Sequence, residues 1–108
     1  MRKHQLIILL LCAWVLWHEK EFTSFGERKE YRHWWDTPTA YSSKGECEAA
    51  QARVFGSIML QEQEMADSEL NKGKAEVKSV PNRLVIFSRQ DFSSQQRLTC
   101  LPDTVNPQ

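Results

Sequence analysis

The chain of 108 residues is long enough for one small domain, and its 14 basic and 14 acidic residues give a formal charge of zero. This balance argues against nucleic acid or an anionic membrane surface as the partner, because both select strongly basic proteins. Four tryptophans can supply a core to so short a chain, since each large aromatic side chain buries on the order of 150–250 Å².

Residues 1–13 have the layout of a secretory signal, with a basic start followed by an apolar run over residues 6–13. The run is shorter than the roughly 20 residues that a membrane-spanning helix needs. We therefore expect a signal peptide and an exported, periplasmic or extracellular protein; the alternative is a leader that stays uncleaved and tethers the chain to the inner membrane. Cys12 raises the question of a lipid anchor, although Leu11 stands where a small residue is typical.

Two strands are predicted directly after the leader. Residues 14–22 are rich in aromatic and β-branched side chains, and residues 27–35 have the composition of a returning strand. A hairpin turn centred between Phe25 and Gly26 sets Trp17 opposite Trp34 and His18 opposite His33. In this register one face, which we expect to pack on the helix, carries Trp14, Leu16, Phe22, Tyr31 and Trp35.

A helix is predicted to begin near Lys44. Ser43 and Glu46 have the spacing of a capping box, in which the hydroxyl accepts from the Glu46 N–H and the carboxylate reaches back to the Ser43 N–H. The glycine at position 73 is typical of a helix end, so the helix is expected to run as far as residue 71. One apolar stripe follows the cap, formed by Cys47, Ala50, Val54 and Ile58.

The C-terminal third predicts two more strands. Residues 84–87 form a compact apolar run, residues 89–96 are polar enough for a connection, and residues 96–101 alternate weakly. The expected fold class is α+β, a small antiparallel sheet in the chain order β-β-α-β-β packed by one amphipathic helix. The domain is expected to span residues 14–105, with residues 106–108 as a tail.

Cys47 and Cys100 are the two cysteines outside the leader. In an oxidising compartment they are expected to form a disulfide that ties the first turn of the helix to the last strand. The alternative is a pair of buried free thiols in a cytoplasmic protein.

Three segments together resemble a group of small exported bacterial proteins of unknown function. They are the WVLW at residues 14–17, the aromatic residues before the Glu46–Cys47 pair, and the CLPDTV ending at residues 100–105. This chain departs from the group at Asn106, where an aspartate is typical. The resemblance implies export and a bond between Cys47 and Cys100, and it implies no activity.

The sequence offers few groups for chemistry. His18 and His33 are close enough in the predicted hairpin to share a metal ion, but two ligands are too few for a structural zinc site, and two half-exposed strand histidines are the alternative. Glu62 and Glu64 point to different faces of a helix and are interpreted as solvated. Trp17 and Trp34 could form a ligand-stacking face, although core packing is the ordinary role of tryptophan.

We therefore predict a small binding or structural module of the bacterial envelope, with no catalytic activity and no cofactor. Its expected partner is an envelope or extracellular protein, with no nucleic acid and no stable membrane span. The alternative is a periplasmic protein that binds a metal or a small ligand through His18 and His33 or through an exposed tryptophan face.

Overall fold

The computed structural model describes residues 13–81 and 83–108, which form one antiparallel sheet and one long helix. The predicted leader falls, apart from Ala13, outside the described residues, and so does Cys12. The α+β class is confirmed, but the chain order is wrong because a short strand precedes the helix and another follows it. The elements are β1 (Trp14–Ser24), β2 (Tyr31–Trp35), β3 (Thr39–Tyr41), α2 (Lys44–Asp67), β4 (Ala75–Val80), β5 (Leu84–Arg89) and β6 (Phe92–Pro102).

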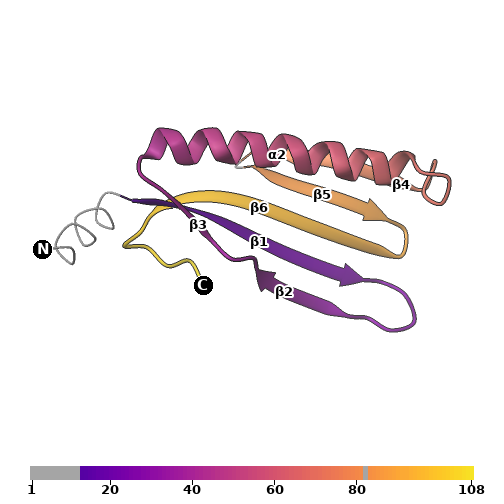
Figure 1. The fold of residues 1–108 in the computed structure, drawn as a ribbon. Helices are drawn as coiled ribbons and strands as arrows, with labels where there is room; N and C mark the ends of the chain where they lie inside the picture. The colour runs from indigo at the N-terminus through magenta and orange to yellow at the C-terminus, as the bar shows by residue number, and fades with distance from the viewer. Residues whose placement is uncertain (1–12, 82) are drawn as a thin grey trace, which may run out of the picture.

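The two longest strands, β1 and β6, lie side by side in the middle of the sheet (Figure 1). The six strands are ordered β2-β1-β6-β5-β4, and β3 pairs with β1 as well. Strands β2 and β3 follow one another along the same edge of β1, at residues 19–23 and 14–16 of β1. The chain leaves the sheet between them at Pro38, which has no N–H to offer a ladder. This edge is therefore one interrupted strand.

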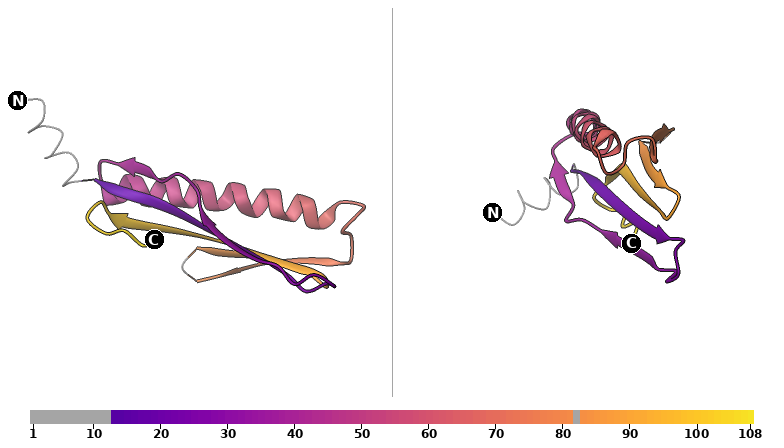
Figure 2. Two further views of the ribbon diagram at one scale, coloured as in Figure 1. Left: turned by 90° about the horizontal axis from the view of Figure 1, so that it is seen from below. Right: turned by 90° about the vertical axis from the view of Figure 1, so that its right-hand side faces the viewer.

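Helix α2 lies on one face of the sheet, as the end-on view of Figure 2 shows, and packs on β4, β5, β6, β1 and β3. The opposite face, called here the outer face, has no helix over it in the part of the chain that the structure describes. Among these residues no helix has the length and apolar character needed to cross a membrane. The core lies between α2 and the sheet, and its buried residues are Leu16, Cys47, Ala50, Ile58, Val85 and Leu98.

The predicted start of the helix is confirmed. The Ser43 hydroxyl accepts from the Glu46 N–H at 3.1 Å, while the Glu46 carboxylate accepts from the hydroxyl and N–H of Ser42 rather than from the N–H of Ser43. The predicted end at residue 71 is wrong, because the helix stops at Asp67 with Ser68 as its C-cap. Gly73 lies in the following turn, where its φ of +74° suits a residue without a side chain.

The predicted hairpin register is also wrong, by three residues. Ser24 and Tyr31 flank the connection, and the Ser24 N–H donates to the Glu30 carbonyl, so the loop is longer than the expected tight turn. Glu21 therefore faces His33, and Glu19 faces Trp35. Because the shift is odd, it exchanges the face that β2 shows to its neighbours.

The predicted disulfide joins Cys47 to Cys100, with their Cα atoms 6.1 Å apart. Cys47 is completely buried at the start of the helix, and Cys100 lies opposite Leu16 in the β1–β6 ladder. The bond therefore fixes the first turn of α2 to the middle of the sheet, across a sequence separation of 53 residues. Nearby, the Ala13 carbonyl accepts from the N–H of Asp103, which holds the two ends of the described chain together.

Replacing Cys47 with serine should lower the free energy of unfolding by about 2–5 kcal/mol, because it frees the closed loop and leaves a hydroxyl in an apolar site. Cys100→Ser should cost nearly the same, and the double variant little more, since all three remove one bond. Denaturant unfolding of the four proteins measures this. Two free thiols in the denatured, unreduced wild-type protein would contradict the bond.

Candidate functional site

The two strand histidines lie on opposite faces of the sheet. His18 is opposite Leu98 in β6 and points to the helix side, whereas His33 is opposite Glu21 on the outer face. The alternative of an ion shared by His18 and His33 therefore has no support, because the observed hairpin register does not set the two histidines opposite one another. The two histidines belong to two separate polar clusters.

The expected pair of Trp17 and Trp34 is separated in the same way. Trp17 is buried on the outer face, where its ring meets the ring of Trp35 edge-on at 5.9 Å between centroids. Trp34 is opposite Lys20 on the helix side and is 42% exposed. The two rings do not form one stacking face.

The first cluster begins with a buried carboxylate on the helix. The apolar stripe of α2 continues from Ile58 to Ala66, and Glu62 occupies the position between them. Glu62 is 8% exposed, so the interpretation of this residue as solvated is wrong, while Glu64 on another face of the helix is exposed. A carboxylate thus stands where the helix would ordinarily bury an apolar side chain.

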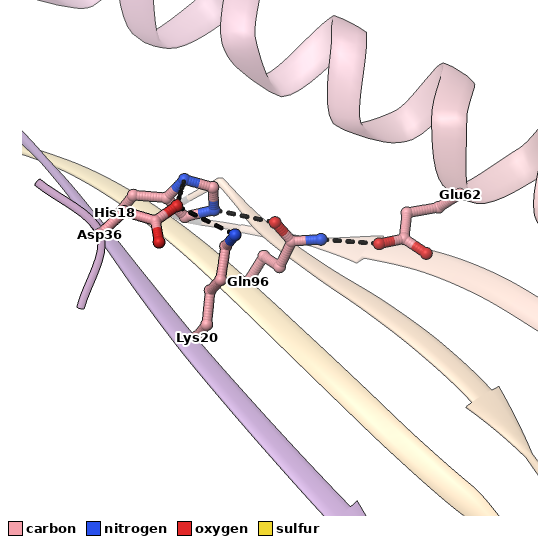
Figure 3. Close-up of polar contacts among 5 residues, drawn as sticks. All are labelled: His18, Lys20, Asp36, Glu62 and Gln96. Atoms are coloured by element: carbon pink, nitrogen blue, oxygen red, sulfur yellow. Dashed lines mark hydrogen bonds and ion pairs between the residues drawn. The ribbon is translucent and has the colours of Figure 1, made fainter. Parts of the chain in front are cut away.

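A row of polar contacts runs from this carboxylate across the sheet (Figure 3). Gln96 Nε2 donates to Glu62 Oε1 at 2.6 Å, and Gln96 Oε1 lies 2.8 Å from His18 Nε2. The other ring nitrogen, Nδ1, is 3.3 Å from Asp36 Oδ2, which also accepts from Lys20 Nζ at 2.9 Å. The residues come from α2, β6, β1 and the segment after β2, so the row, called here the helix-side network, links four parts of the fold.

Burial shifts the pKa values of the two central titratable groups of this network in the directions that favour their neutral forms. Burial raises the pKa of Glu62, against the hydrogen bond from Gln96 and the charge of Lys20, which lower it. Burial lowers the pKa of His18, and Lys20 lowers it further, while Gln96 and Asp36 raise it. Oε2 of Glu62 is buried and has no hydrogen-bond partner among the described residues, which adds to the cost of charging this carboxyl.

Gln96 connects the protonation of these two groups. In the orientation seen, the amide suits a protonated His18 Nε2 and an ionised Glu62. Turning the amide over would let its NH₂ donate to a neutral His18 Nε2 while its oxygen accepts from a protonated Glu62. With Nδ1 of His18 protonated toward Asp36 in both arrangements, the two hold the same number of protons, because the proton on Nε2 in the first lies on Glu62 in the second. One proton can therefore lie on His18 or on Glu62, and both hydrogen bonds of Gln96 are kept in either case.

The second cluster lies on the outer face. Glu19 and Glu21 alternate along β1 and share that face, and His33 stands opposite Glu21 on β2. His33 Nε2 is 2.7 Å from Glu19 Oε2, and one ligand atom from each of the three side chains lies within 4.8 Å of the others. A shallow hollow beside them is lined by the two glutamates with Gln95, Arg97 and Leu84.

The sequence contained signals for both clusters that the interpretation missed. Glu62 falls four residues after Ile58 and four before Ala66, which continues the buried stripe. Glu19 and Glu21 are two residues apart in a predicted strand, which places both carboxylates on one face. Only the pairing with His33 was hidden, because it depends on the hairpin register.

Comparisons with family models, with curated proteins and with solved structures found no match to this chain. The geometry of the chain itself therefore carries the functional argument. Cys47 is bonded to Cys100, and the Ser42 and Ser43 hydroxyls both take part in capping α2.

Replacing Gln96 with leucine should destabilise the protein, because Glu62 and His18 both lose a hydrogen-bond partner. An unsatisfied buried polar group costs about 1–3 kcal/mol, and we expect the free energy of unfolding to fall by that amount or more. Glu62→Leu combined with Gln96→Leu should cost less than the sum of the two single changes. Strictly additive losses in denaturant unfolding would show that the two residues are not coupled.

Glu62→Gln should become more favourable relative to wild type as the pH rises. A raised pKa in the folded state gives stability that is fully present below the ordinary value of 4.5 and is lost as the pH climbs through the folded pKa. Glutamine does not titrate and escapes this loss. His18 acts with the opposite sign, below its ordinary value of 6.5, but the histidine is present in both proteins and its direct contribution cancels in the difference. A difference in unfolding free energy between the two proteins that stays constant between about pH 4 and pH 7 would contradict a raised pKa of the Glu62 carboxyl.

Proposed function

We propose that this chain is an exported, disulfide-stabilised binding module of the bacterial envelope, without catalytic activity, that engages another protein through β2. The observation that carries the proposal is the exposure of this edge strand. Four of its five residues are exposed, namely Tyr31, Arg32, His33 and Trp34.

The composition of β2 supports binding to a protein. Tyrosine, tryptophan and arginine are the residue types that most often dominate the energy of protein interfaces. Tyr31 is 63% exposed and Trp34 is 42% exposed, and they project from opposite faces of the same strand. An exposed strand edge also offers unpaired backbone N–H and C=O groups to a partner. A partner strand added at β2 would thus meet both backbone and aromatic groups.

The disulfide supports the location. A bond between Cys47 and Cys100 suits an oxidising compartment, and it is compatible with the export that the start of the sequence predicts. It also holds the core rigid, so the β2 edge is presented on a stable scaffold. Rigid presentation reduces the entropy lost on binding.

The alternative function, metal or small-ligand binding, does not gain support from the residues first considered for it. His18 and His33 lie on opposite faces, and so do Trp17 and Trp34.

A photo-crosslinking residue placed at Tyr31 should capture a protein partner in the envelope, whereas the same residue at Leu60 should not. Leu60 is a matched control because it is also 63% exposed but lies on α2, away from β2. Trp34→Ala should weaken the capture at Tyr31, since it removes a large contact side chain from the same edge. Equal capture at the two positions would place the interface elsewhere.

Export is tested separately by the intact mass of protein recovered from the periplasm or medium. We expect a chain that begins near Trp14, because Ala13 is a small residue that suits the position just before the cut. Full-length protein confined to the cytosol would refute export.

A further inference from the structure

We propose that Glu19, Glu21 and His33 form a binding site for a divalent transition metal, with Zn²⁺ as the best-suited ion. An imidazole nitrogen and two carboxylates from adjacent strands converge on one point of the outer face. The inference is independent of the proposed protein partner, because all three ligands belong to this chain.

The backbone already places the ligands. Glu19 and Glu21 lie on β1, which is paired on one side with β2 and on the other with β6, so the positions of their Cα atoms are fixed by two ladders. His33 is directly opposite Glu21 and diagonal to Glu19. Sites supported by regular elements hold their geometry better than sites on loops.

The distances suit a metal with small adjustments of side chains. Ligands about 2.1 Å from a tetrahedral zinc ion are about 3.4 Å from one another. Here the three ligand atoms lie within 4.8 Å of one another, and His33 Nε2 is already 2.7 Å from Glu19 Oε2. Rotation about the glutamate side-chain bonds closes the difference, and the metal then takes the place of the shared proton between His33 and Glu19.

The surroundings favour a bound ion in two ways. The His33 ring meets the Trp35 ring edge-on at 5.8 Å, which restricts its rotation, and an oriented imidazole is a better metal ligand. The hollow lined by Glu19, Glu21, Gln95 and Arg97 gives room for a water molecule as fourth ligand. Three protein ligands and one open position is a common arrangement for zinc.

The chemistry of the set selects among ions. Calcium and magnesium take oxygen ligands and need six or more of them. One imidazole with two carboxylates suits zinc and its neighbours in the first transition row. Two carboxylates also supply negative charge, part of which is offset by Arg97, the residue opposite Glu19 in β6.

The position of Arg97 allows a test that distinguishes a metal site from a simple ion pair between His33 and Glu19. Arg97 and Glu19 form no ion pair among the described residues. The positive charge of Arg97 nevertheless lies on the face of the sheet that would hold the bound cation. Removing that charge should strengthen metal binding, because like charges repel. If His33 and Glu19 form only a surface ion pair, Arg97→Gln would have no metal affinity to change.

The experiment is a calorimetric titration of Zn²⁺ into the oxidised, tag-free mature protein. We expect saturation at one ion per chain, a loss of affinity of at least about tenfold in His33→Ala or Glu21→Gln, and a gain in Arg97→Gln. Glu76→Gln is the matched control, because Glu76 is an exposed glutamate on the edge strand β4 and should leave the affinity unchanged.

A second measurement needs no variant. Addition of Zn²⁺ to the ¹⁵N-labelled wild-type protein should shift the NMR signals of Glu19, Glu21 and His33 before any others. Absence of saturable binding would overturn the proposal. A folded His33→Ala variant that bound zinc as the wild type does would also overturn the proposal. So would shifted signals that centred on His18 and the helix side of the sheet.

Discussion

The pairing of β1 with β6 is the constraint on which the rest of the structure depends. It runs without interruption from Trp14 opposite Pro102 to Ser24 opposite Phe92 and joins the two ends of the described chain. Because side chains alternate along a strand, this one register decides which residues meet α2 and which lie on the outer face. Leu16, His18 and Lys20 face the helix side. Glu19 and Glu21 lie on the outer face.

The helix-side network is a consequence of that register, whereas the outer-face cluster also needs the pairing of β1 with β2 that sets His33 opposite Glu21. Gln96 stands opposite Lys20, which brings its amide between His18 and the helix. A slip by one residue would turn Gln96 to the outer face and leave Glu62 buried without its hydrogen bond. If β1 were turned over instead, Glu19 and Glu21 would move toward α2, where two carboxylates could not be solvated. The core and the two polar clusters therefore favour the same pairing.

The disulfide reinforces this arrangement from the helix. Cys100 lies opposite Leu16, so the bond to Cys47 anchors α2 at one end of the central ladder. At the other end the turn after α2 is held by Asn71, whose side-chain amide donates to the Met65 carbonyl and whose oxygen accepts from Arg89 of β5. The helix is thus attached at both ends, and Glu62 in between is kept over Gln96.

Much of this fold could be predicted from local patterns. The cap at Ser43, the stripe through Cys47, Ala50 and Ile58, and the α+β class all follow from the spacing of residues near one another in sequence. The disulfide followed because only two cysteines lie outside the leader.

The remaining features depend on contacts between distant residues. The loop after β1 is tied to the turn between β5 and β6 by the Phe25 N–H, which donates to the Asp91 carbonyl, so the hairpin register is not decided by its own turn. Strand β3 has three residues and is assigned by its pairing with β1. The outer-face cluster was missed for the same reason, since His33 meets Glu21 only in the register that the whole sheet imposes.

The most direct test of the account is the register of β1 against β6 in solution. Cross-strand NMR contacts should join Trp17 with Thr99, His18 with Leu98 and Glu21 with Gln95, as in the ladder described. The same contacts displaced by one residue would turn one of these two strands over relative to the other. That result would place Gln96 and His18 on different faces of the sheet and so remove the physical basis of the helix-side network.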